Sequence, residues 1–150
     1  MTETIRMITL VDNTSNHPSL LAEHGLAFWI EYGPHKILFD TGASNIIQTN
    51  AMMLGIDLSQ TEAVILSHGH YDHTGGLMRV LDNAPNAKMY LHPDAVKPKF
   101  SCRDNQPCRP IGMPALTVLH LREHNPALDI QWTTESQEIF PGVWSTVSFR

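Results

Sequence analysis

The stretch Ser67–Gly76 reads SHGHYDHTGG and holds the pattern H-x-H-x-D-H, whose side chains are all common metal ligands. The apolar run at residues 63–67, AVILS, precedes it and is typical of a short buried strand. Because side chains two positions apart on an extended chain point the same way, His68 and His70 can both face one cation. We therefore expect a metal site to begin where this strand ends.

Asp72 and His73 follow where the chain turns toward the next helix, so they can reach a second, neighbouring cation. Two imidazoles, a third protein ligand and a water make a catalytic zinc site. Two metals roughly 3.5 to 4 Å apart can activate a bridging hydroxide and hold the attacking and leaving oxygens of a hydrolysis. The motif predicts a site for two Zn²⁺ ions, or Mn²⁺ or Fe²⁺ in their place, that activates water. Asp72 is expected to orient the hydroxide as well as bind metal.

Length and composition describe a folded domain with few charges. The 150 residues are 42% hydrophobic and 17% charged, which excludes intrinsic disorder and fits a single domain over residues 1–150. Ten Lys and Arg against fifteen Asp and Glu give a net charge of −5 without a basic run, which argues against a nucleic-acid partner. The sequence has no continuous apolar region typical of a secretory signal or a membrane span. We expect a cytoplasmic protein that acts on a small molecule.

Apolar periodicity and turn residues predict an alternation of strands and helices. The expected strands cover residues 5–11, 27–32, 36–39, 63–67 and 88–91, with weaker ones at 130–132 and 143–149. The expected helices cover residues 44–54, 77–81 and 115–123, and residues 97–114 are expected to form a loop. This order predicts an α/β or α+β sandwich.

The segment LSHGHYDHTGGL at residues 66–77 resembles the signature loop of the metallo-β-lactamase fold. Members of that fold include lactonases, glyoxalase II, phosphodiesterases and nucleases. The resemblance implies an αββα sandwich in which His68 and His70 bind the first metal and Asp72 and His73 bind the second. The iron flavoprotein branch of the fold has Glu at the position of His70, so the resemblance argues against that branch.

Further segments resemble one branch of this fold: VDNT from Val11, EHGLAFWIEY from Glu23, KILFDTGAS from Lys36, LGIDL from Leu54, YLHPDA from Tyr90 and PG at Pro141. The branch is labelled as related to dihydropteroate synthase, or as the dihydropterin ribofuranosylaminobenzene phosphate synthase of methanopterin synthesis. Complete sites in the fold take a further His on each metal and a bridging Asp from a more C-terminal region.

The resemblance therefore implies that residues 1–150 correspond to the N-terminal half of the sandwich. Besides a metal-dependent hydrolase of this fold, this leaves a second hypothesis, a catalytically silent half-domain that binds metal weakly or associates with another chain. An uncovered sheet would expose apolar surface and a strand edge, which favours a homo-oligomer.

Asp40, at the end of the apolar run KILF, has three interpretations. The resemblance implies that it hydrogen-bonds a metal ligand from behind the site. An Asp here also suits the cap of a helix that begins near Ser44. The triplet DTG is finally typical of aspartic proteases, which pair two such carboxylates across a dimer. The protease hypothesis explains none of the histidine motif.

Four other residues have weaker signals. By resemblance, the loop with His24 approaches the active site and His24 faces the substrate; otherwise it is a solvated loop histidine. For His92, which precedes a proline, a structural role is favoured. His120 and His124 match the metalloprotease pattern H-x-x-E-H, but Asn-Pro directly after His124 ends any helix.

Cys102 and Cys108 bracket a polar loop. In a reducing compartment, two cysteines at this separation are more often free thiols than a disulfide or a zinc site. We expect free thiols here.

Overall fold

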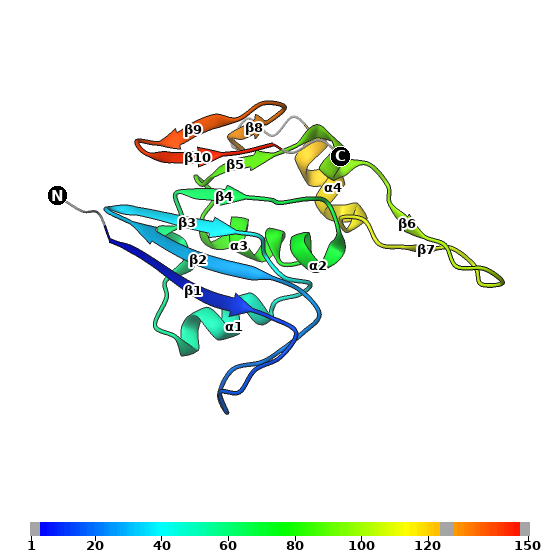
Figure 1. Cartoon of the computed structure of the whole chain (residues 1–150), viewed down its shortest axis with the longest axis horizontal. Coiled ribbons are helices and arrows are strands. Elements are labelled where there is room, and N and C mark those ends of the chain that lie inside the picture. Colours follow the sequence, from blue (N-terminus) through cyan, green and yellow to red (C-terminus); the bar gives the residue numbers. More distant parts are fainter. Residues whose placement is uncertain (1–3, 124–127, 148–150) are drawn as a thin grey trace.

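A computed structural model describes residues 4–123 and 128–147 of the chain. Its centre is a six-stranded mixed sheet in the order β1-β2-β3-β4-β5-β8 (Figure 1). β2 runs antiparallel to both β1 and β3, and β4, β5 and β8 run parallel to β3. The strands are β1 (Ile5–Val11), β2 (Ala27–Tyr32), β3 (His35–Phe39), β4 (Ala63–Ile65), β5 (Lys88–Leu91) and β8 (Ile130–Trp132).

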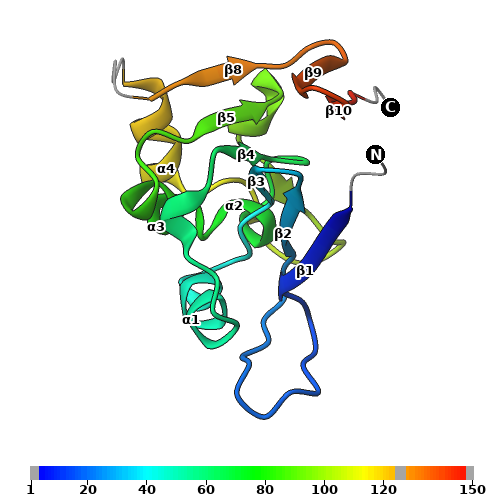
Figure 2. The same cartoon turned by 90° about the vertical axis from the view of Figure 1, so that its left-hand side faces the viewer.

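The helices and two small hairpins surround this sheet. The helices are α1 (Ile46–Met53), α2 (Tyr71–Thr74), α3 (Leu77–Asn83) and α4 (Ala115–Arg122), with 3-10 turns η1 (Leu58–Gln60) and η2 (Pro93–Val96). The hairpins pair β6 (Phe100–Ser101) with β7 (Arg109–Pro110), and β9 (Gln137–Phe140) with β10 (Val143–Ser145). Figure 2 shows α1, α3 and α4 on one side of the sheet and the β9–β10 hairpin on the other. No helix in the described ranges has the length and hydropathy needed to cross a membrane.

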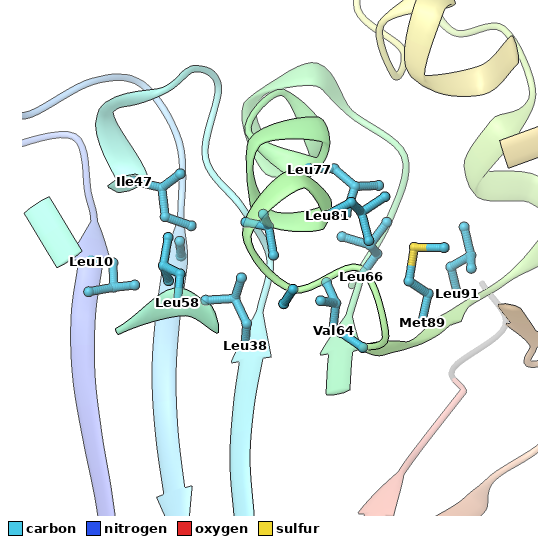
Figure 3. Close-up of a cluster of buried hydrophobic side chains, with 14 of the residues drawn as sticks. Leu10, Leu38, Ile47, Leu58, Val64, Leu66, Leu77, Leu81, Met89 and Leu91 are labelled. Atoms are coloured by element: carbon cyan, nitrogen blue, oxygen red, sulfur yellow. The ribbon is translucent and has the colours of Figure 1, made fainter. Parts of the chain in front are cut away.

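The main core fills the space between the sheet and the helices (Figure 3). Leu38, Val64 and Met89 extend from three neighbouring strands toward Ile47 and Leu77, and all five side chains are fully buried. Burying a side chain of this size contributes roughly 1.5 to 3 kcal/mol. Contacts of this kind hold the helices against the inner face of the sheet.

The outer face of the sheet carries a smaller apolar cluster. Ile37, Ala63 and Tyr90 are buried there and pack against Ile139 and Phe140 of the β9–β10 hairpin. Since β3, β4 and β5 contribute apolar side chains to both faces, they appear in the sequence as continuous apolar runs.

The predicted α/β class is confirmed, and most predicted elements agree with the structure to within two residues. Residues 97–114, expected to be a loop, contain the β6–β7 hairpin, whose two-residue strands are too short to give an alternating pattern. The strand β9 has only two apolar residues, Ile139 and Phe140, which are too few to give a pattern. Tertiary pairing, rather than local sequence, defines these strands.

The parallel strands bring their carboxyl ends to one edge of the sheet. Phe39 pairs with Ile65, and Ile65 pairs with Tyr90, so β3, β4 and β5 end in register. Asp40 directly follows β3, and the histidine motif begins three residues after β4. This edge is where open α/β sheets commonly place a site.

Candidate metal centre

The structure brings three histidines of the motif together. His68 lies in the loop after β4, His70 is the residue before α2, and His73 lies within α2. The ring centroids of His68 and His70 are 4.5 Å apart, and those of His68 and His73 are 4.2 Å apart. The turn into α2 thus places imidazoles from an extended segment and a helix side by side.

Asp40 lies behind these rings, with a fully buried carboxylate. Its Oδ2 accepts hydrogen bonds from Nδ1 of His73 at 2.7 Å and from the hydroxyl of Ser67 at 2.6 Å. Its Oδ1 accepts the backbone N–H of Ser67 at 2.8 Å. The carboxylate therefore joins the end of β3 to both the loop after β4 and helix α2.

Helix capping, the second interpretation of Asp40, is not what the structure shows, because the hydroxyl of Ser44 accepts the backbone N–H of Ile46, the first residue of α1, at 3.2 Å. The carboxylate of Glu23 accepts the backbone N–H groups of Ala43 and Ser44 at 2.9 and 3.0 Å in the loop before the helix. The protease interpretation requires a carboxylate that a second copy can reach. Asp40 is fully buried and bonded within its own chain, which does not fit that requirement.

These hydrogen bonds fix where two imidazoles carry their protons. The single hydroxyl proton of Ser67 goes to the Asp40 carboxylate, so Nδ1 of His68, 2.9 Å from Ser67 Oγ, must be the donor in that contact. His73 likewise donates from Nδ1 to Asp40. In their neutral forms both rings then keep an unprotonated Nε2, which is the form that binds a metal.

The backbone of Asp40 is in the left-handed region, with φ of 56°. For a residue with a side chain this conformation costs about 1 kcal/mol. Backbone hydrogen bonds from Asp40 to Ile65 at 2.9 Å and from Thr41 to His73 at 2.8 Å hold the turn in place. The sheet edge and α2 thus keep the carboxylate aimed at Ser67 and His73.

Asp72 lies on the opposite side of His73 from Asp40. Its Oδ2 is 3.5 Å from Nε2 of His73 and 3.3 Å from Nε2 of His24. Nδ1 of His24 contacts Oδ1 of Asn13 at 3.2 Å, and the side chain of His24 is 69% exposed. The structure therefore places His24 at the solvent-facing rim beside the motif.

Electrostatics favour a neutral His68. Burial lowers the pKa of His68, and repulsion from the neighbouring His73 and His70 lowers it further. The carboxylates of Asp40 and Asp72 oppose this shift only in part. A lowered pKa keeps the imidazole unprotonated at neutral pH, as a metal ligand requires.

These side chains are of the kinds that bind divalent cations. The available donors are Nε2 of His68 and His73, the ring of His70 and the carboxylate of Asp72. The carboxylate of Asp40 orients His73 by a hydrogen bond, as carboxylates commonly do for metal-binding histidines. Within residues 4–123 and 128–147, however, no group of three or more His, Cys, Asp or Glu side chains is arranged to hold a metal ion. The donors lie together without forming a closed set of ligands.

The model of the metallo-β-lactamase superfamily matches residues 21–134, which include the whole motif and its supporting turn. The chain belongs to this superfamily. Relatives from Methanocaldococcus jannaschii are an uncharacterized protein, 38% identical over 93 residues, and 7,8-dihydropterin-6-methyl-4-(β-D-ribofuranosyl)-aminobenzene-5'-phosphate synthase, 32% identical over 106 residues. The alignments cover 61% and 66% of this chain.

A solved metal-dependent hydrolase of the β-lactamase superfamily resembles 94% of the chain with a TM-score of 0.69 and 27% identity. A diphosphatase of the PhnP family has the same fold, with a TM-score of 0.56 and 17% identity over 91% of the chain. The chain spans 36% of the length of each archaeal relative and 47% of the solved hydrolase. These matches confirm the metallo-β-lactamase fold over part of its full extent.

A cavity of about 770 Å³ opens beside this superfamily motif, along the outer face of the sheet. His68 and Gly69 line it, together with His92 and Lys99. His92 Nδ1 accepts the backbone N–H of Asp94 at 3.1 Å, which is the structural role expected for it. Lys99 had no signal in the sequence, because its position at the cavity depends on how residues 93–99 fold back.

Ser67 is the other residue that the sequence did not single out. Its position between a predicted strand and the first histidine was visible, but its bonds to Asp40 and His68 depend on strand pairing. The pair His120 and His124 gains no support. His120 lies on α4, away from the motif in sequence, and His124 lies outside the described residues.

The expectation of free thiols is wrong for this structure, because Cys102 and Cys108 form a disulfide. The reason is the β6–β7 hairpin, in which Phe100 pairs with Pro110 and Ser101 pairs with Arg109. This pairing reverses the chain and brings the two Cα atoms within 4.2 Å of each other. The disulfide closes the tip of an arm that projects from the body of the molecule (Figure 1).

Proposed function

We propose that this chain forms the metal-binding part of a metal-dependent hydrolase that acts on a small ester, lactone or phosphoester. The observation that carries the proposal is the convergence of His68, His70 and His73 in front of a buried carboxylate that sets the protonation of two of the rings. The similarity to a solved metal-dependent hydrolase supports the same reaction class.

In this proposal His68 and His70 hold one cation, and Asp72 and His73 hold a second. Bound divalent metal, Zn²⁺ or alternatively Mn²⁺ or Fe²⁺, supplies Lewis acidity toward a carbonyl or phosphoryl oxygen and lowers the pKa of water. The residues around it prepare the ligands. Asp40 keeps the proton of His73 on Nδ1, and burial keeps His68 neutral.

Asp72 and His24 contribute at the open side of the site. Their contact of 3.3 Å places a carboxylate and an imidazole at the rim, where one can orient an attacking water and the other can meet the substrate. Backbone hydrogen bonding of Leu26 to the carbonyl of Asp72 at 3.2 Å ties the His24 loop to α2.

The relatives differ in the reaction their names give. One is named as a synthase, and hydroxyacylglutathione hydrolase from Francisella tularensis subsp. holarctica is 29% identical over 92 residues. Because a motif of this kind is specific for metal binding rather than for one substrate, we carry over no individual substrate from these relatives.

Metal analysis of the purified 150-residue protein tests the proposal. Zinc titration against a chelating indicator is expected to give about two equivalents per chain, as a two-metal site requires. His70→Ala should weaken binding at least about tenfold and abolish turnover of p-nitrophenyl acetate and bis(p-nitrophenyl) phosphate. His120→Ala, which removes a histidine from α4, is the matched control and should change neither.

Two outcomes separate the competing hypotheses. Less than one tightly held equivalent, with no turnover of any ester or phosphodiester, would contradict the two-metal site and favour the catalytically silent half-domain. Equal effects of His70→Ala and His120→Ala would contradict metal binding at the motif.

A further inference from the structure

The cavity beside the motif has a lining of two chemical kinds. His68, His92 and Lys99 contribute polar groups to its lining, and side chains of the sheet such as Phe39 and Tyr90 contribute apolar surface. A molecule that fills this space therefore needs both a polar group and an apolar body that lies over the sheet. Its volume of about 770 Å³ lies within the usual range of roughly 300 to 1,000 Å³ for small-molecule pockets.

Lys99 is held at the cavity wall by backbone acceptors. Its Nζ donates to the carbonyl oxygens of Asp94 at 2.6 Å and Lys97 at 3.3 Å. Asp94 belongs to η2, and the next residue, Ala95, lies directly against Gly69 of the motif. Through η2, the ammonium group is thus fixed relative to the histidines.

No carboxylate among the described residues forms a close ion pair with Nζ of Lys99, although the charge of Asp94 favours its protonated form. The carboxylate of Asp94, which also lines the cavity, forms its ion pair with Nζ of Lys97. An ammonium group has three N–H donors, and the two backbone carbonyls use two of them. A partly buried cation with a remaining donor favours an anion in the cavity.

We propose that Lys99 binds the anionic group, a carboxylate or a phosphate, of a substrate whose apolar part lies over Phe39 and Tyr90. The assignment of this ligand as a substrate rests on the proposed function. Lys99 is then a specificity-determining residue that selects amphipathic anions over neutral esters. Because Lys99 and His68 line the same cavity, an anion bound to Lys99 fixes how the rest of the molecule lies relative to the motif.

Binding to the metal-free, full 150-residue protein tests this assignment without requiring turnover. The probes are phenyl phosphate, benzoate and the neutral analogue benzyl alcohol, followed by isothermal titration and by amide chemical shifts. Saturable binding of at least one anion is expected, with shifts at Lys99 and Gly69. Comparing phenyl phosphate with benzoate shows which anion the site prefers.

Lys99→Met is expected to weaken binding of the preferred anion about tenfold, which corresponds to about 1.4 kcal/mol, and to leave the neutral analogue unaffected. Lys88→Met removes the same charge from an exposed position outside the cavity and should leave all three affinities unchanged. Lys99→Arg keeps the charge and should retain most of the binding. If Lys99→Met fails to fold, the shift pattern of the unchanged protein and the Arg variant still decide the question.

Equal anion affinities in Lys99→Met and Lys88→Met, or shifts that avoid Lys99 and Gly69, would overturn the assignment. A different result would contradict the proposed hydrolase function alone: anion binding that depends on Lys99, in a protein that hydrolyses none of the esters. If the ratio of turnover of anionic esters to turnover of neutral esters is the same in Lys99→Met and Lys88→Met, the hydrolase function stands and Lys99 does not determine specificity.

Discussion

Oδ2 of Asp40 lies 2.7 Å from Nδ1 of His73, so a buried carboxylate at the end of β3 sets the proton position of an imidazole in α2. The same oxygen accepts the hydroxyl of Ser67, which in turn contacts His68. One carboxylate thus orients two of the three clustered imidazoles. Each of these two rings then has an Nε2 that carries no proton. The network predicts that metal affinity depends on residues that do not themselves bind the metal.

Replacing Asp40 with Asn should weaken zinc binding about 10- to 100-fold. An amide nitrogen in place of Oδ2 cannot accept from His73 or Ser67, so the proton of His73 moves to Nε2. The loss of a buried charged acceptor should also lower the free energy of unfolding by about 1 to 3 kcal/mol. Zinc titration and urea denaturation measure the two effects. Asp82→Asn, an exposed change on α3, should alter neither, and unchanged zinc affinity in Asp40→Asn would refute the network.

In Ser67→Ala, the proton of His68 should no longer be held on Nδ1. Without the hydroxyl, Nδ1 of His68 loses its acceptor and Asp40 loses a donor, which should cost about 1 to 2 kcal/mol of stability. Nitrogen chemical shifts of the imidazole rings report the tautomer directly. We expect His68 to change from the Nδ1–H form to a mixture, while the exposed variant Ser19→Ala leaves it unchanged. A His68 signal that is the same in both variants would show that Ser67 does not set its tautomer.

Much of this site follows from sequence, and the part that does not depends on long-range contacts. The motif spacing, the strand before it and the position of Asp40 after β3 were all visible as local patterns. The partners of Asp40 were not, because Ser67 and His73 lie 27 and 33 residues away and meet it only through parallel pairing of β3 and β4.

The Cys102–Cys108 disulfide and Lys99 escaped prediction for a related reason. Both lie in a polar segment without apolar periodicity, whose fold depends on pairing to other residues. The backbone N–H of Tyr71 donates to the carbonyl of Ile111 at 3.0 Å, so the arm attaches to the start of α2. Nothing in the composition of residues 97–114 indicates that contact.

Gly69→Ala should destabilise the fold, since a Cβ atom at Gly69 would lie only 1.8 Å from the carbonyl oxygen of Ala95. Backbone on both sides must move, so we expect a loss of about 3 kcal/mol in urea denaturation. Gly33→Ala is the matched control. A Cβ there meets nothing within 4 Å, and its φ of +54° should cost only about 1 kcal/mol. Equal losses in the two variants would show that the motif does not pack tightly against η2.

Reduction of the Cys102–Cys108 disulfide should open the tip of the arm and leave the body of the protein folded. The β6–β7 pairing consists of only two residue pairs, Phe100 with Pro110 and Ser101 with Arg109, and the arm lies outside the main core. We expect trypsin to cleave after Arg103 at least about tenfold faster with reductant, while the free energy of unfolding changes by less than about 1 kcal/mol, since core burial is unaffected.

The double variant Cys102→Ser/Cys108→Ser should show the fast cleavage with or without reductant, which separates the disulfide from other effects of the reagent. Zinc affinity should stay unchanged in it, because the contacts at the base of the arm, Ile111 N–H to Lys99 O at 2.9 Å and Tyr71 N–H to Ile111 O, do not involve the cysteines. Alkylation of both thiols without reductant would mean that the disulfide does not form. Weaker zinc binding in the double variant would instead show that the tip of the arm helps to hold His70 in place.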